Sequence, residues 1–478
     1  MKKITTLVLI LWGISFANAQ YAVLHNFNDT NGANPYGALI ASGNNLYGTT
    51  WMGGKSKSGV VFSVQANGTG YTVLHNFIGT DGSSPNGALT LSDSTLYGTT
   101  SVGGINDSGV IFSVQTNGSG YTVLHNFKQS DGAEPSNGTL TLSGSTLYGM
   151  TYTGGMHGYG TIYSIHTNGA GYTVLHNFIG TDGQQSNCSL TLSGSTLYGM
   201  TSWGGKDGYG VVFSINTNGS GYIVLHNFND STGGNPVGYL TLSGNTLYGV
   251  TNHGGANFLG TIFSIQTNGN GYTDMYNFSG SGTDGEEPVG GLVLSGNTLY
   301  GIASQGLGQS SYGLIFSIQT NGSSFSDLFD NFGFDIVYTG MWPENALTLS
   351  GNSLYGMTSN GGLYSNYGVI FSLSIPASVN ELSTGREMIS AFPNPSNGVF
   401  NLQIANGQQL MANSQVEVYN MLGEKVYAAP LNPPVRGTSS TTISLPYGEG
   451  RGAAGIYLYR VTSETGNVIG TGKIIIQK

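Results

Sequence analysis

The chain has 478 residues, enough for two or more domains, and only 8 % of them are charged, with a formal net charge of −10. Glycine occurs 79 times and aromatic residues are plentiful, so the low charge indicates many short strands joined by turns and not disorder. The Lys and Arg residues between positions 21 and 375 are only Lys55, Lys57, Lys128 and Lys206, which excludes nucleic-acid binding and an arginine fork for a carboxylate or phosphate there.

The amino-terminal segment has the three parts of a secretory signal peptide. Lys2 and Lys3 form the positive end, residues 4–16 the apolar core, and residues 17–19 the small-residue cleavage site Ala-Asn-Ala. We therefore expect residues 1–19 to be removed and the mature protein to be secreted or extracellular. No later stretch is apolar for long enough to predict a transmembrane segment.

Most of the chain is an internal repeat. Copies of a unit of about fifty residues fill positions 20–375. They begin at Tyr21, Tyr71, Tyr121, Tyr172, Tyr222, Tyr272 and Phe325. Such a period is typical of four-stranded propeller blades, whereas a β-helix coil needs about half that length. The sequence therefore predicts an all-β fold, a seven-bladed β-propeller.

The second copy shows the strands most clearly. Strand-like runs cover residues 88–92, 95–100, 110–116 and 121–127, and turns rich in Asn, Asp and Gly separate them. Both faces of these runs carry apolar residues, as in a sheet that is covered on both sides. We expect Phe112, in the third run, to pack between neighbouring blades.

The order of the runs, with Gly-Gly after the second, resembles a kelch-type propeller blade, in which the innermost strand comes first. On that resemblance the fourth run is the outer strand. The chain then starts with an outer strand, residues 21–27, and ends with three inner strands that lack one. The amino-terminal strand is therefore predicted to complete the last blade and close the ring.

Four motifs recur at nearly constant spacing: GxLxLSGxTLYG, TxxGG, G-[VTL]-[VI]-[FY]-S-[VIL]-x-TNG and YxxLHNF. Together they resemble the GloVer tandem-repeat family of secreted bacterial proteins. The sixth and seventh copies depart most, with Tyr276 and Phe329 in place of the histidine. The resemblance implies the propeller fold and does not imply an activity.

A different sequence follows the repeats. Residues 376–388 are expected to form a linker, and residues 389–478 a second domain. The second segment contains Pro-Asn-Pro, VEVYNMLGEKVY, GIYLYRV and GKIIIQK in that order, and it resembles the carboxy-terminal sorting domain of the type IX secretion system. The residues of the sorting motif are Pro393, Asn394, Pro395, Gly398, Gly423, Gly455 and Lys473.

That resemblance implies a small Ig-like β-sandwich, recognition by the type IX secretion machinery, and passage across the outer membrane. The tail is then expected to be removed, or the protein to be attached at the outer-membrane surface. The alternative is an ordinary adhesive sandwich.

Two repeated residue types suggest a metal site, but each has another explanation. One histidine per blade, as at His25 and His75, leaves the imidazoles too far apart to share an ion, so we expect a repeated hydrogen bond. Asp-Gly loops such as that at Asp81 are expected to be Asx turns, with Ca²⁺ as the alternative for the acidic run 283–287. Cys188 is alone and replaces a small residue. We predict no disulfide, catalytic residue, cofactor or structural metal.

The copies differ most at the two positions before Gly-Gly. These positions belong to one kind of connection, hence to one face of the ring, where loops on a rigid scaffold carry function. Exposed aromatic and amide side chains with little charge suit stacking on sugar rings and hydrogen bonding to hydroxyl groups. Sequence drift at a solvated rim explains the same variation without a ligand. The candidate ligand-binding residues are Trp51, Tyr152, Trp203, His253 and Trp342.

The leading hypothesis is a non-catalytic surface or secreted protein whose propeller face binds a neutral glycan or another protein. One alternative is a carbohydrate-active hydrolase or lyase that uses paired carboxylates on that face, which must lie about 5–10 Å apart. A second alternative is a purely structural repeat protein of the cell surface.

Overall fold

The computed structural model describes residues 20–135, 138–280, 284–306, 312–330, 332, 339–364 and 366–375, followed by separate strands between residues 389 and 476. The chain divides into two compact units, residues 1–377 and 378–478. The predicted signal peptide and the predicted linker 376–388 lie outside the described residues.

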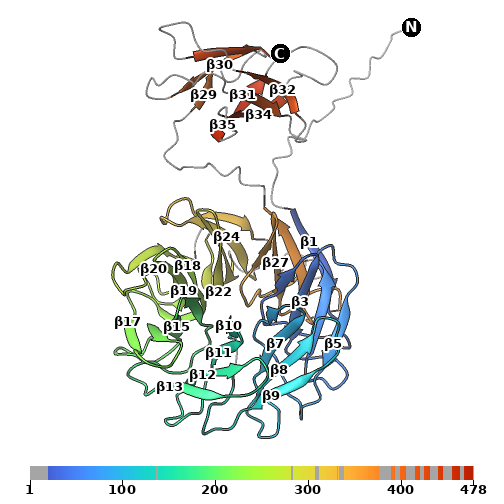
Figure 1. Cartoon of the computed structure of the whole chain (residues 1–478), viewed down its shortest axis with the longest axis vertical. Helices are drawn as coiled ribbons and strands as arrows, with labels where there is room; N and C mark the ends of the chain where they lie inside the picture. Colours follow the sequence, from blue (N-terminus) through green and yellow to red (C-terminus); the bar gives the residue numbers. More distant parts are fainter. Residues whose placement is uncertain are drawn as a thin grey trace, which may run out of the picture. The chain divides into compact units, whose positions relative to one another are not determined.

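The first unit is a ring of four-stranded antiparallel sheets around a central axis (Figure 1). Blades one to three are β2 (Ile40–Ser42), β3 (Asn45–Thr50), β4 (Val60–Gln65), β5 (Thr72–Asn76); β6 (Thr90–Ser92), β7 (Thr95–Thr100), β8 (Val110–Gln115), β9 (Thr122–Asn126); and β10 (Thr141–Ser143), β11 (Thr146–Met150), β12 (Thr161–His166), β13 (Thr173–Asn177). Blades four to six are β14 (Thr191–Ser193), β15 (Thr196–Thr201), β16 (Val211–Asn216), β17 (Ile223–Asn227); β18 (Gly234–Ser243), β19 (Thr246–His253), β20 (Thr261–Gln266), β21 (Thr273–Asn277); and β22 (Glu286–Ser295), β23 (Thr298–Gln305), β24 (Leu314–Gln319), β25 (Ser326–Phe329).

The seventh blade joins the two ends of the repeat region. Its strands are β26 (Thr348–Ser350), β27 (Ser353–Thr358), β28 (Val369–Ser374) and β1 (Gln20–Asn26). β1 pairs antiparallel with β28, so that Tyr21 lies opposite Leu373 and the sheet order is β1-β28-β27-β26. No blade of the ring is left with three strands. The predicted all-β fold and seven-bladed propeller are confirmed.

A buried aromatic ring explains the glycine inside the second strand of each blade. Gly98 in β7 lies opposite Phe112 in β8, and a Cβ added to Gly98 would lie 2.6 Å from Phe112 Cζ. Phe112 is fully buried, in a cluster with Phe77 of the preceding blade. The repeated Leu-Tyr-Gly therefore leaves space for an aromatic residue that packs one blade against the next.

The repeated tyrosine and histidine also join neighbouring blades. The ring of His75 in β5 stacks on Tyr121 of the next blade, with centroids 3.6 Å apart and planes at 4°. The hydroxyl of Tyr121 donates a hydrogen bond to the backbone oxygen of Asp81, at 2.6 Å. The same stacking recurs around the ring in the pairs His25–Tyr71, His125–Tyr172, His176–Tyr222, His226–Tyr272, Tyr276–Phe325 and Phe329–Tyr21.

The described strands of the second unit form two antiparallel sheets. One has the order β29 (Ile389–Phe392), β30 (Val399–Ile404), β33 (Ser440–Ser444). The other has the order β32 (Lys425–Pro430), β31 (Gln415–Tyr419), β34 (Gly455–Thr462), β35 (Val468–Ile476). Gly455 and Lys473 of the sorting motif lie in β34 and β35, and the other motif residues lie outside the described part. The Ig-like topology stays a prediction.

Candidate functional site

The two faces of the propeller are built from different connections. We call loop face the side that carries the Gly-Gly loops between the second and third strands of each blade and the connections from one blade to the next. We call turn face the opposite side, which carries the tight turns within each blade. Lys55, Lys57, Lys128 and Lys206 all lie in segments of the loop face, whereas Asp93 is the charged residue in the turns of the opposite side, among the described residues.

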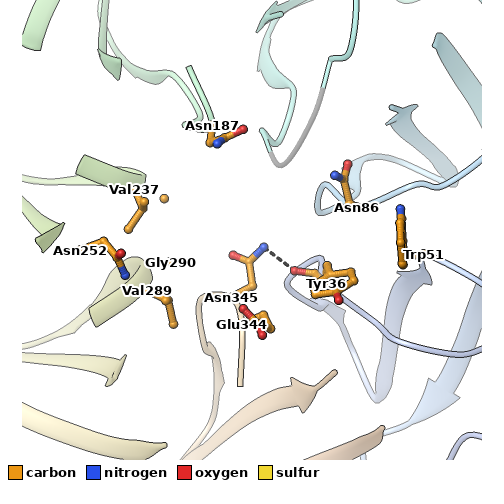
Figure 2. A pocket seen from close by; sticks show the side chains of 11 residues that line it. Tyr36, Trp51, Asn86, Asn187, Val237, Asn252, Val289, Gly290, Glu344 and Asn345 are labelled. Atoms are coloured by element: carbon orange, nitrogen blue, oxygen red, sulfur yellow. Dashed lines mark hydrogen bonds between the residues drawn. The ribbon is translucent and has the colours of Figure 1, made fainter. Parts of the chain in front are cut away.

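A cavity of about 440 Å³ opens at the centre of the loop face (Figure 2). Segments of six blades contribute to it, which places it around the propeller axis. Its lining residues are Tyr36, Trp51, Asn86, Asn187, Val237, Gly238, Asn252, Val289, Gly290, Glu344 and Asn345. The volume is in the range of small-molecule sites.

A repeated left-handed residue aims the lining side chains inward. In the second blade this residue is Ser84, which has φ 58° and precedes Pro85. Its N–H donates to the backbone oxygen of Ser58 in the preceding blade, at 2.9 Å. The equivalent residues, all with φ between 51° and 58°, are Asn34, Glu134, Gln185, Asn235, Glu287 and Trp342.

The second residue after each left-handed position points into the cavity. These residues are Tyr36, Asn86, Asn187, Val237, Val289 and Glu344, and the equivalent in the third blade, Ser136, lies outside the described residues. Sequence analysis missed this position. The sequence signal was weak, because the residue after the recurrent proline varies from copy to copy but so do the residues on either side of that pair.

The two residues before Gly-Gly point in opposite directions, because each pair forms a β-bridge with the connection to its blade. Met52 exchanges backbone hydrogen bonds with Ala33 at 3.0 and 2.9 Å and is 40 % exposed. Trp51 lines the cavity instead. Its ring meets Tyr36 edge to face, with centroids 5.5 Å apart and planes at 75°.

The structure thus brings one candidate residue, Trp51, into the cavity and leaves the other four outside its lining. Tyr152 holds the position of Trp51 in the third blade and is partly buried. Trp203 and Trp342 are each 40 % exposed, and Trp342 packs edge to face on Tyr312 at 5.4 Å. His253 is exposed at the end of β19.

The aromatic side of the cavity also carries its carboxylate. Figure 2 shows Asn345 and Glu344 next to Tyr36, with Val237 farther away. Asn345 Nδ2 donates to the backbone oxygen of Tyr36 at 2.6 Å. Burial raises the pKa of Glu344, and burial together with the charge of Glu344 raises the pKa of Tyr36. Glu344 accepts a hydrogen bond from Ser359 Oγ at 3.4 Å.

Histidine and aspartate side chains of the repeat form hydrogen bonds that hold the segments of the loop face in place. His75 Nε2 lies 2.9 Å from Asp81 Oδ2, and Asp81 Oδ1 accepts from Ile78 N at 2.8 Å. The neighbouring Asn76 accepts from the N–H of Lys55 in the Gly-Gly loop, at 3.0 Å. These bonds fix the connection and the loop against the outer strand. The predicted Asx turn is wrong at Asp81, because its side chain accepts from Ile78 N, three residues before it, whereas an Asx turn uses the N–H two residues after, and Ser83 N donates to Val102 O instead.

Among the described residues, no group of three or more His, Cys, Asp and Glu side chains could hold a metal ion. Asp284, within the acidic run considered for Ca²⁺, accepts hydrogen bonds from Ser279 N at 2.7 Å and Ser279 Oγ at 3.0 Å. Cys188 is buried, and burial raises the pKa of its thiol to about 12, which disfavours the nucleophilic thiolate.

The Gloeobacter/Verrucomicrobia repeat family model matches residues 10–209 and 186–399. The chain belongs to this family. A secretion-system C-terminal sorting domain matches residues 390–477. This Gloeobacter/Verrucomicrobia repeat protein is therefore exported by the type IX system and is secreted or located at the outer-membrane surface. No helix in the described part is long and apolar enough to cross a membrane.

No curated protein matches this chain. Among solved structures, PorZ, a surface component of the type IX secretion system of Porphyromonas gingivalis, is 12 % identical, with a TM-score of 0.37 over 92 % of this chain and 69 % of that chain. A fungal alcohol oxidase of the AA5 family, in complex with copper, is 11 % identical, with a TM-score of 0.45 over 96 % of this chain and 99 % of that chain. Likenesses this weak carry no argument about function.

Proposed function

We propose that this exported propeller protein is a non-catalytic glycan-binding protein whose central cavity on the loop face receives the ligand. The observation that carries the proposal is the lining itself, which contains the aromatic pair Tyr36 and Trp51 together with the amide side chains of Asn86, Asn187 and Asn345. Aromatic rings stack on the apolar faces of sugars, and amides both donate to and accept from hydroxyl groups.

The charge of the cavity argues against acidic ligands. None of its described lining residues is basic, and one, Glu344, is acidic. A phosphorylated or carboxylated ligand would meet a carboxylate and no compensating cation. The ligand is thus a glycan without anionic groups.

The same lining disfavours the hydrolase alternative. General acid–base cleavage of a glycosidic bond uses two carboxyl groups on opposite sides of the scissile bond. Among the described residues that line the cavity, Glu344 is the single carboxylic acid. Binding needs only the arrangement already present.

The rest of the proposal concerns how the protein is exported and where it acts. The signal peptide, residues 1–19, is removed on export, and the sorting domain, residues 389–478, engages the type IX secretion machinery. The propeller, residues 20–375, then acts outside the cell as a free or surface-attached binding protein.

The test compares Trp51→Ala with Trp203→Ala on a panel of soluble oligosaccharides, measured by calorimetry. Trp51 lines the cavity, whereas Trp203 is exposed elsewhere on the loop face, so the second variant is a matched control. We expect Trp51→Ala to weaken binding about tenfold or more, because a central aromatic anchor typically contributes over 1 kcal/mol. Trp203→Ala should bind as the wild type does.

Four outcomes would contradict the proposal. Equal loss in both variants would move the site to the rim of the loop face. New reducing ends in the wild-type reaction would favour the hydrolase, and an unsaturated product would favour a lyase. No binding to any member of the panel would favour the purely structural protein.

A further inference from the structure

Glu344 is the single carboxylate among the described residues that line the cavity, and its charge indicates which functional group the ligand carries. Glu344 follows Pro343 at the position that aims side chains inward, where the other described copies carry Tyr, Asn or Val. A carboxylate at the mouth of a neutral site is costly to desolvate unless something compensates its charge.

Among the described residues, no cation compensates the charge of Glu344. Within the described part of the chain, no Lys, Arg or His forms an ion pair with Glu344. Its hydrogen-bond donor, Ser359, is neutral, and the charge of a second acid, Glu287, also acts on it and raises its pKa further. No cation in the described part of the chain therefore balances the negative charge that Glu344 carries when it is ionised.

Two aromatic rings add to that potential. Tyr36 is near enough to Glu344 for the carboxylate to raise its pKa, and Trp51 packs on Tyr36. The faces of aromatic rings carry partial negative charge and attract cations. A carboxylate near Tyr36, on which Trp51 packs, is a better partner for an ammonium group than for a hydroxyl group.

We infer that the cavity selects a glycan that carries a free amino group, with the sugar ammonium paired to Glu344. This inference rests on the proposed glycan-binding function and narrows its ligand class. The amino group supplies the positive charge that pairs with Glu344. Trp51 and Tyr36 contact the sugar ring that carries this amino group. An N-acetylated sugar lacks the positive charge and loses the pairing.

The experiment uses three β-linked tetramers that differ at one substituent. At mildly acidic pH, where its amines are protonated, the glucosamine tetramer carries an ammonium at C2, whereas its N-acetylated form carries a neutral amide and cellotetraose a hydroxyl. Binding to the full-length mature protein is measured by calorimetry near physiological salt, which screens weak attraction to the acidic surface. We expect the amino tetramer to bind about tenfold more tightly than both neutral tetramers, as one partly desolvated ion pair provides.

Two variants separate local pairing from overall charge. Glu344→Gln removes the cavity carboxylate and keeps its shape, and it should abolish the preference for the amino tetramer. Asp93→Asn removes the same charge from an exposed turn on the opposite face, where φ is 52° and asparagine is tolerated, and it should keep the preference.

The outcomes distinguish this inference from the function on which it rests. If the neutral tetramers bind as tightly as the amino tetramer and Trp51→Ala abolishes their binding, the glycan site stands and the amine preference is wrong. A preference that survives Glu344→Gln, or that Asp93→Asn removes equally, also overturns the inference. Binding of none of the three overturns the inference and leaves the broader glycan proposal to the oligosaccharide panel.

Discussion

Asp327 is a residue at which this chain departs from its own repeat. It lies in the outer strand β25, where most equivalent strands carry valine, as at Val73 and Val123, and β21 carries Asp274. Its Oδ1 is buried and has no hydrogen-bond partner among the described residues. Burial and the charge of Asp330 raise its pKa from 3.8 to about 6. The position therefore destabilises the sixth blade at neutral pH.

We expect Asp327→Val to raise the free energy of unfolding at pH 7 by about 1–3 kcal/mol, because it removes a buried, incompletely paired charge. An acid whose pKa is higher in the folded state destabilises the fold as pH rises from its unfolded to its folded pKa, here from 3.8 to about 6. The gain should thus be small at pH 4 and complete at pH 7. Urea unfolding at both pH values checks this, and a gain of equal size at both would contradict it.

Tyr121 contributes to the stability of the fold in two ways that can be measured separately, through its hydroxyl and through its ring. The ring stacks on His75, and the hydroxyl donates to Asp81 O across the blade boundary. In the sixth blade Phe325 keeps the stacking without a hydroxyl.

We expect Tyr121→Phe to cost about 0.5–1.5 kcal/mol, the net contribution of one hydrogen bond. Tyr121→Ala should cost about 3–5 kcal/mol, because it also removes the packed ring. Chemical denaturation of both variants separates the two contributions. Equal losses would show that the ring contributes nothing beyond the hydroxyl.

At the scale of the element, the strands follow the repeat closely but not in every detail. The runs predicted over 95–100 and 110–116 are β7 (Thr95–Thr100) and β8 (Val110–Gln115). The outer strand β9 contains a bulge, because Ile111 lies opposite His125 and Phe112 opposite Val123. Alternation along the sequence cannot reveal such a bulge, since the extra residue, Leu124, is set by the pairing.

Substitution of Phe112 tests how strongly the packing of one blade against the next stabilises the propeller. It is fully buried between the first and second blades and occupies the space that Gly98 leaves free. We expect Phe112→Ala to lower the free energy of unfolding by about 3–5 kcal/mol, as for other buried aromatic residues. Chemical denaturation provides the measurement, and a loss below about 1 kcal/mol would contradict this role.

At the scale of the whole molecule, the chain enters and leaves the propeller on the same side. Gln20 lies opposite Ser374, and Ile375 N donates to Asn352 O, in a turn of the turn face, at 2.9 Å. The cavity opens on the loop face. Gln20 and Ile375, the first and last described residues of the propeller, thus lie at the face opposite the cavity.

Ring closure by β1 predicts the effect of its removal. Deletion of residues 20–27 exposes the edge of β28, so we expect a lower melting temperature and association of molecules through that edge. Size-exclusion chromatography and thermal unfolding measure both. A peptide of residues 20–27 added in excess should restore the monomer, and a scrambled peptide should not. A monomeric deletion variant of unchanged stability would contradict the closure.

The sequence by itself determined the fold and the export route, because both follow from sequence patterns that are local or repeated along the chain. A unit of about fifty residues with four strand-like runs permits few architectures, and the sorting motifs are contiguous. It also directed attention to the face on which the cavity opens, through the variable residues before Gly-Gly.

Only the tertiary structure decided which of those residues share a site. Trp51 and Met52 are neighbours in sequence, yet a β-bridge turns one into the cavity and the other away from it. Tyr36 and Glu344 are far apart in sequence and meet because the ring closes between the seventh and first blades. The direction of a side chain depends on strand pairing, and the contents of a central cavity depend on ring closure. Neither property belongs to a single repeat.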